Sequence, residues 1–180
     1  MVKEIERMTS TLHQMEMDYW IHHALFSFHW WVILVLNAVF LFLFLSFIDR
    51  QRILLITLAF MISYVITSIL DDIGEYFQLW IYPYHFLQFL APFTSVEFII
   101  VPSIMALLYQ TFSRWKSFLI ADFIASLVIS FIVQPIFVYL DFYKLNNWTY
   151  TYSFLVLFGI GVVVKLIMDF IKMKQFNRTA

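Results

Sequence analysis

Several ionisable, hydroxyl and amide side chains occur inside or beside stretches that are otherwise apolar. Those that could form one polar site are Thr67, Ser68, Asp71, Glu97, Ser130, Gln134 and His29. An unpaired charge inside a bilayer costs at least a few kcal/mol, so such residues are by default functional or paired with one another. Carboxyl groups among hydroxyl and amide groups can bind a small ligand, hold an ion or carry a proton.

The composition of the chain is that of a membrane protein. Of the 180 residues, 63% are hydrophobic and 13% are charged, whereas soluble domains have about 25% charged residues. The net charge of −1 argues against a nucleic-acid partner, because phosphate binding needs a concentrated basic surface. The absence of cysteine excludes disulfides and thiolate metal sites. We find no cofactor motif and expect the lipid bilayer as the main partner.

Five apolar stretches have the length of about 20 residues that a transmembrane helix needs. They cover approximately residues 26–48, 53–80, 85–110, 117–140 and 150–171. Pro83 separates the second stretch from the third. Pro92 and Pro102 predict kinks in the third, because each removes a backbone hydrogen bond. We therefore predict an all-α bundle of five transmembrane helices forming one domain, residues 26–180.

Residues 1–25 are predicted to form a separate amphipathic helix. Apolar side chains recur there every three or four residues, at Ile5, Met8, Leu12, Met15 and Tyr19. This spacing places them on one helix face. The stretch lacks the basic start and apolar run of a secretory signal. We expect the helix to lie on the membrane surface or on the bundle.

The basic residues predict an orientation in the cell membrane. One side of the predicted bundle collects Arg50, Arg52, Arg114, Lys116, Lys172, Lys174 and Arg178. The other side has Lys3, Arg7 and Lys144. The positive-inside rule then places the C-terminus in the cytoplasm and the N-terminus outside.

Helical spacing predicts that the polar side chains meet. In the fourth stretch every fourth residue is polar, at Asp122, Ser126, Ser130 and Gln134. In the second stretch polar residues recur every three or four positions, at Tyr64, Ser68, Asp71, Glu75 and Gln78. Such polar stripes belong against protein or water rather than lipid. A rise of about 1.5 Å per residue from the basic turns places the candidate residues in the outer half of the membrane.

Two interpretations of this site have similar weight. In the first, it is an outward-opening pocket or ion pathway with Glu97 at its floor. In the second, the same residues form a hydrogen-bond network that only fixes the register of the helices. The corresponding functions are binding or passage of a small ligand or ion, and a structural role in an envelope assembly with another membrane protein or a second copy. An intramembrane lipid-modifying enzyme, with Glu97 and Asp71 as acid and base, is the alternative.

A metal or haem site is a lower-ranked alternative. Asp18, His22 and His29 have spacings of four and seven, which would put them on one helix face. Imidazoles with a carboxylate can bind a metal, and imidazole can bind a haem iron. Histidines beside Trp20 and Trp30 also suit the headgroup level of a bilayer.

Short motifs from residue 71 onward form a recognisable combination. They are Asp71-x-x-Gly74, Leu79-Trp80-x-Tyr82, Val101-Pro102, Leu108-Tyr109-Gln110, Trp115-Lys116, Gln134-Pro135 and Trp148. In this combination the chain resembles a family of small, uncharacterised multi-pass membrane proteins of spore-forming Firmicutes. The resemblance implies a bacterial inner-membrane location and supports the helix count, but it carries no activity. In that family the positions of Glu97 and Gln134 are often both acidic, so the resemblance implies that this chain has half of a carboxylate pair.

Overall fold

The computed structural model of the chain describes residues 1–90 and 98–176. The elements in chain order are α1 (Val2–Tyr19), α2 (Phe28–Phe47), α3 (Ile53–Tyr76), β1 (Trp80–Ile81), α4 (Ile100–Thr111), α5 (Trp115–Val128), α6 (Gln134–Tyr139), β2 (Lys144–Leu145) and α7 (Tyr150–Phe176). Two π-helical turns, Trp20–Ala24 and Ile129–Val133, follow α1 and join α5 to α6. The predicted all-α class is confirmed.

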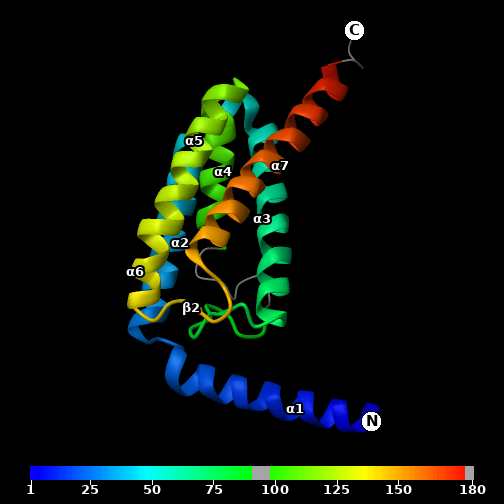
Figure 1. Cartoon of the computed structure of the whole chain (residues 1–180), viewed down its shortest axis with the longest axis vertical. Coiled ribbons are helices and arrows are strands. Elements are labelled where there is room, and N and C mark those ends of the chain that lie inside the picture. The colour runs from blue at the N-terminus through cyan, green and yellow to red at the C-terminus, as the bar shows by residue number, and fades with distance from the viewer. Residues whose placement is uncertain (91–97, 177–180) are drawn as a thin grey trace.

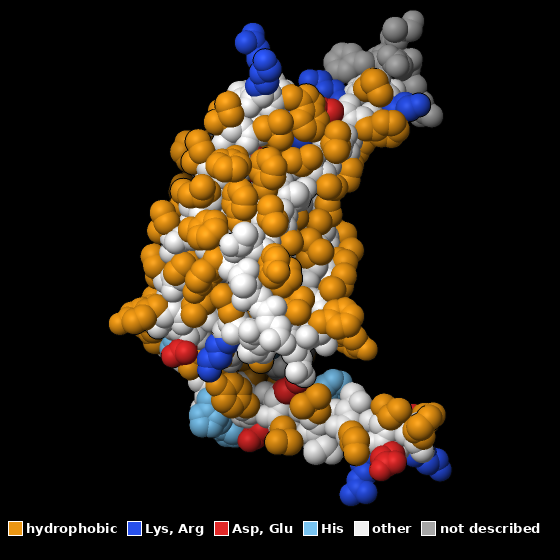
Figure 2. Space-filling view, in the orientation of Figure 1, with side chains coloured by type: hydrophobic (Ala, Val, Ile, Leu, Met, Phe, Trp, Pro, Cys, Tyr) orange, Lys and Arg blue, Asp and Glu red, His pale blue; other side chains and the backbone are white. Residues whose placement is uncertain are grey.

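Among the described residues, four helical segments are long and apolar enough to cross a membrane, namely Phe28–Phe47, Arg50–Tyr76, Trp115–Tyr139 and Tyr150–Lys174. They form an upright bundle, and α1 lies across one end of it (Figure 1). Hydrophobic side chains cover the sides of the bundle, whereas charged side chains gather at its two ends (Figure 2). Such apolar sides suit contact with a lipid bilayer.

The two ends of the bundle differ in charge and structure. We call the end with the α2–α3 and α4–α5 turns the basic end (Figure 1), because these turns and the start of α5 contain Arg50, Arg52, Arg114 and Lys116. At the opposite end, which we call the ribbon end, β1 pairs antiparallel with β2. The short helix α4 contacts α2, α3, α5 and α7, so it occupies the centre of the bundle.

The second predicted helix ends earlier than expected, at Tyr76 instead of Trp80. Gln78 has a φ of 52°, in the left-handed region that terminates many helices. The N–H of Leu79 then donates to the carbonyl of Gly74, which satisfies a carbonyl left open at the helix end (2.9 Å). Asp141, with a φ of 59°, ends α6 in the same way. Both chain reversals lead directly into the strands of the ribbon.

The third predicted helix is wrong in its first part. Residues 85–90 are not helical, and α4 begins at Ile100. The carbonyls of His85 and Phe86 accept hydrogen bonds from the indole N–H groups of Trp20 and Trp30, each at 3.0 Å. These carbonyls therefore bind side chains near the N-terminus instead of an intrahelical partner. Pro92, predicted to kink this helix, lies outside the described residues.

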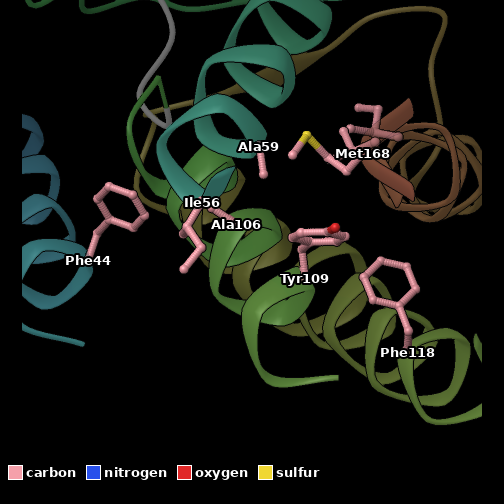
Figure 3. Close-up of a cluster of buried hydrophobic side chains, with 9 residues drawn as sticks. Phe44, Ile56, Ala59, Ala106, Tyr109, Phe118 and Met168 are labelled. Atoms are coloured by element: carbon pink, nitrogen blue, oxygen red, sulfur yellow. The ribbon is translucent and has the colours of Figure 1, made fainter. Parts of the chain in front are cut away.

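The helices pack around two groups of buried side chains. The first, which we call the basic-end core, joins α2, α3, α4, α5 and α7 (Figure 3), and consists of Phe44, Ile56, Ala59, Ala106, Tyr109, Phe118, Ile160, Val164 and Met168. The second, which we call the aromatic cluster, lies toward the ribbon end and consists of Ile33, Trp80, Tyr82, Phe98, Phe142 and Tyr143. The aromatic cluster forms one side of the candidate site.

Candidate functional site

A cavity of about 80 Å³ lies between α3, α4, α7, the π-helical turn Ile129–Val133 and the ribbon end. Its polar lining residues are Thr67, Ser68, Asp71, Gln134 and Ser153. Its aromatic lining residues are Trp80, Tyr82, Phe98, Phe137, Tyr143 and Trp148. A volume of this size is large enough for several water molecules or a small organic molecule.

Four residues of the predicted site line this cavity together. Thr67, Ser68 and Asp71 come from α3, and Gln134 begins α6. Ser68 and Asp71 of one predicted polar stripe thus line the same cavity as Gln134 of the other. Their role in binding a ligand stays a prediction.

Two other predicted site residues, Ser130 and His29, are not among the residues that line the cavity. Ser130 is fully buried in the π-helical turn but does not line the cavity. His29 stacks on Tyr84 at a centroid distance of 3.9 Å, and its Nε2 lies 3.0 Å from the carbonyl oxygen of Leu140. Glu97 lies outside the described residues, so the predicted pocket floor and the acid–base pair with Asp71 stay predictions.

Two of the polar groups in the cavity wall are held by hydrogen bonds. The Tyr82 hydroxyl donates to the Asp71 carboxyl at 2.9 Å, which fixes the carboxyl beside the ribbon. The Thr67 hydroxyl lies 3.0 Å from the carbonyl oxygens of Ser63 and Tyr64 in its own helix. Asp71 is therefore the lining group that can present a carboxylate to a ligand.

Two other polar atoms of the cavity wall have no hydrogen-bond partner in the described part of the chain. They are the indole Nε1 of Trp80, a donor, and the amide Oε1 of Gln134, an acceptor. More than nine-tenths of buried polar groups in proteins are paired, so each exception needs an explanation.

The aromatic rings form a continuous wall. Trp80 meets Trp148 edge to face at a centroid distance of 4.9 Å, and Tyr82 lies 5.2 Å from Tyr143. The Trp148 indole N–H donates to the Ser153 hydroxyl at 2.9 Å, which orients both side chains. The cavity is therefore built from firmly positioned rings.

The sequence did not identify this aromatic wall as part of the site. Tyr82 and Trp148 occur in the short motifs without a predicted role in the site, and Tyr143 has no predicted role. The pairing of Trp80 with Leu145 brings the residues after α3 next to those after α6, and two-residue strands have no sequence periodicity. The usable signal was the motif Leu79-Trp80-x-Tyr82 together with Trp148.

The single helix face predicted for Asp18, His22 and His29 is wrong. The chain leaves the helical conformation at Leu25, whose ψ is 130°, so α1 and α2 are separate helices. His22 lies 3.3 Å from Asp18, and His29 belongs to α2. Within residues 1–90 and 98–176, no three His, Asp or Glu side chains are placed to hold a metal ion.

Comparison with protein-family models, with curated proteins and with solved structures finds no match for this chain. The chemistry of the cavity is therefore inferred from its own residues. Rings, one carboxyl group, an unpaired donor and an unpaired acceptor are suited to binding a small polar molecule.

Proposed function

We propose that this multi-pass membrane protein binds a small organic cation in the cavity at the ribbon end. The observation that carries the proposal is the composition of the cavity wall. Asp71 is its ionisable acid, six aromatic rings surround the space, and no Lys, Arg or His occurs among its described lining residues. Aromatic faces carry a negative quadrupole potential, so rings and a carboxylate together favour a cation.

The unpaired atoms suggest a further feature of the ligand. A hydroxyl group on the cation could accept a hydrogen bond from Trp80 Nε1 and donate one to Gln134 Oε1. The ligand class that fits is thus an amino alcohol, with an ammonium group toward Asp71 and a hydroxyl group toward the ribbon. The cavity volume of about 80 Å³ limits it to a few non-hydrogen atoms.

Ethanolamine and 1-propanol provide a matched pair of probes. They have the same shape and hydroxyl group, but an alkyl amine is protonated at pH 7. With four non-hydrogen atoms and a limit of about 1.5 kcal/mol per atom, ethanolamine can bind no more tightly than tens of micromolar. We expect millimolar ethanolamine to raise the Tm of the purified protein, since ligand at ten times its Kd stabilises by about 1.4 kcal/mol. Equal shifts with the two probes would contradict a cation site.

The carboxyl group is tested by neighbouring aspartates. Asp71 lines the cavity, whereas Asp72 is exposed and does not. Asp71→Asn keeps an acceptor for the Tyr82 hydroxyl and removes the charge, so the ethanolamine response should be lost. Asp72→Asn should keep it. Retention of full binding in Asp71→Asn would exclude this residue from the site.

The arrangement of α4 supports five membrane crossings. Helix α3 ends at the ribbon end and α5 begins at the basic end, so the chain between Tyr76 and Trp115 must traverse the bundle (Figure 1). Helix α4 has only 12 residues, or about 18 Å at 1.5 Å per residue, so it supplies only part of this crossing. We propose that the basic end faces the cytoplasm of a bacterial cell and that the cavity faces outward.

Reporter fusions test this topology. A reporter active only in the cytoplasm should give a signal when fused to the C-terminus and none when fused after Tyr84. The opposite pattern would reverse the orientation, and signals from both fusions would contradict the helix count.

Helix α1 is proposed to lie at the membrane surface. Ile5, Met8, Leu12 and Met15 are all more than half exposed, and no residue of α1 is buried. An apolar stripe on an otherwise charged helix is typical of interfacial helices. An environment-sensitive dye on Met8→Cys should report an apolar surrounding in vesicles, whereas the same dye on Ser10→Cys should not. Identical spectra at both positions would argue against this placement.

A further inference from the structure

A row of buried polar side chains runs along α5 and the π-helical turn toward the cavity. Asp122, Ser126 and Ser130 are all 0% exposed. Both carboxyl oxygens of Asp122 and both serine hydroxyls have no hydrogen-bond partner within the described residues. The next member of the row, Gln134, lines the cavity and has the unpaired Oε1. We call these four residues the polar row.

The side chain of Asp122 on α5 contacts α7 at Gly161. A Cβ atom on Gly161 of α7 would collide with both carboxyl oxygens of Asp122. The carboxyl group therefore lies directly against the α7 backbone, inside a membrane-crossing segment. Its depth is about 10 Å from the start of α5, at 1.5 Å per residue.

The charged and titratable groups around this carboxyl group are few. One turn along α7 from Gly161 is Lys165, whose Nζ lies 3.5 Å from Asp169 and 3.2 Å from the carbonyl oxygen of Ser113. Helix α4 presents the Tyr109 ring, which lies under the same ammonium group. No ion pair joins Asp122 to Lys165 in the described structure, since Lys165 is paired with Asp169. Asp122 therefore has no permanent counter-ion among these neighbours.

The geometry of the row suits stepwise proton movement. Neighbouring members are four residues apart, or about 6 Å along the helix. Two hydrogen bonds in series span about 5.5 Å, so one water molecule in each gap would connect successive members. In an α-helix, side chains four residues apart drift around the axis. The turn Ile129–Val133 is π-helical, and a π-helical turn holds more residues than an α-helical one. It therefore offsets part of the rotation between residues four apart. Ser130 stays buried, and Gln134 lines the cavity.

We propose that Asp122 is an intramembrane proton-binding site that exchanges its proton with the cavity through Ser126, Ser130 and Gln134. In the step itself, a hydronium ion that enters from the cavity gives one proton to a carboxylate oxygen of Asp122. One O–H bond of the hydronium ion breaks, one O–H bond forms on the carboxyl group, and a neutral acid and a water molecule are left. The inference does not depend on cation binding, because the row and its burial are the same whether or not the cavity binds an amine.

A purely structural role predicts a different arrangement. A carboxyl group that fixes helix register does so through hydrogen bonds to the neighbouring helix. Asp122 makes none within the described residues, although Ser126 is one turn away. An ionisable group in a membrane interior that stabilises nothing by pairing is most readily explained by function.

Infrared difference spectroscopy on the full chain in lipid vesicles tests the proposal. Spectra between pH 4 and pH 10 should show the carbonyl band of a protonated carboxylic acid that disappears as the pH rises. This change should be lost in Asp122→Asn and retained in Asp169→Asn, a carboxyl variant near the basic end. A band that depends on Asp122 but stays constant over the whole pH range would overturn the proposal, and so would a titrating band unaffected by Asp122→Asn.

A second pair of variants assigns the band without removing the carboxyl group. Gly161→Ala pushes a methyl group against Asp122, whereas Gly159→Ala places one in open space. Gly161→Ala should therefore shift the frequency of the titrating band, and Gly159→Ala should leave it unchanged.

The rate of the band change tests the route through the polar row. After a rapid pH jump, Ser130→Val should slow the band change. Ser103→Val, which replaces a buried serine of α4, should not slow it. Equal rates in wild type and Ser130→Val would exclude the route through the polar row.

Discussion

The basic-end core and the cavity at the ribbon end are filled in opposite ways. In the basic-end core, apolar side chains from five helices close the interior (Figure 3). The one buried ammonium group beside it, that of Lys165, contacts Asp169, a carbonyl oxygen and the rings of Tyr109, Trp115 and Phe118. At the ribbon end, Trp80 and Gln134 each have a polar atom without a partner in the described structure.

This difference separates structural from functional polarity. Lys165 is buried, but pairing with Asp169 and contact with aromatic rings compensate its desolvation. Trp80 Nε1 and Gln134 Oε1, in residues that line the cavity, lack such compensation within the described residues. A protein that only needed stability would fill this space with apolar side chains, because unpaired buried groups cost about 1–3 kcal/mol each. These two unpaired atoms therefore reduce stability at the ribbon end, and the proposed ligand binding accounts for this cost.

The largest expected contrast is between two phenylalanines. Phe118 is 1% exposed in the basic-end core, and Phe137 lines the cavity. Phe118→Ala should destabilise the protein by about 3 kcal/mol, since a closed core cannot collapse around the lost ring. Phe137→Ala only enlarges a space that already exists, so we expect a loss of about 1 kcal/mol. Thermal melting in detergent measures both.

Equal losses for the two variants would show that the cavity wall is packed as tightly as the core. A larger loss for Phe137→Ala would reverse the comparison. Phe131→Ala, at an exposed position of the π-helical turn, controls for removing a ring from the lipid-facing side.

The sequence predicted the helices well because lipid imposes a simple rule on them. A crossing helix needs a long apolar run, and the four long segments satisfy this requirement. The four-residue polar spacing of the fourth stretch also predicted burial correctly, since Asp122, Ser126 and Ser130 are fully buried. The i, i+4 spacing of Lys165 and Asp169 likewise predicts the ion pair that the structure contains.

The parts that could not be predicted depend on contacts between distant residues. The non-helical residues 85–90 have an apolar composition like a helix, but the indoles of Trp20 and Trp30 bind their carbonyl groups. The local sequence contains no signal for a hydrogen-bond donor that is 56 or 65 residues away in the chain. The ribbon that brings Tyr82 and Tyr143 into the cavity wall is equally non-local.

A second prediction concerns the contact that positions Trp80. A Cβ atom on Gly74 would collide with the Trp80 indole, whereas one on Gly159 meets nothing within 4 Å. Gly74→Ala should therefore cost about 1–3 kcal/mol through overpacking, and Gly159→Ala should not destabilise. In a Trp80→Leu background the Gly74→Ala cost should shrink, because the colliding ring is gone. An undiminished cost there would place its origin outside this contact.

A third prediction addresses the turn at the basic end. The Gln110 side chain accepts from the N–H of Asp49 and donates to the carbonyl of Phe47, both at 2.8 Å. Gln110→Ala should destabilise by about 1–2 kcal/mol, because it removes both bonds from the α2–α3 turn. Gln51→Ala, an exposed glutamine in the same turn, should change the Tm little. A neutral Gln110→Ala would mean that the helices alone fix this turn.

The smallest effect is a dependence of stability on pH that arises at the ribbon end. Burial lowers the pKa of the His85 imidazole below its ordinary value of 6.5, although a bond to Gln88 opposes the shift. As the pH falls through 6.5, the unfolded chain takes up a proton at His85 before the folded protein does. The contribution of His85 to stability is therefore complete above pH 6.5 and is lost as the pH falls toward the lower, folded pKa.

We expect the Tm of His85→Gln to fall less than that of wild type between pH 7.5 and pH 5.5. His13→Gln, which removes an exposed histidine of α1, controls for the loss of an imidazole. If the His85→Gln profile runs parallel to that of wild type, the acid sensitivity arises at other groups, and burial of His85 does not affect stability over this range.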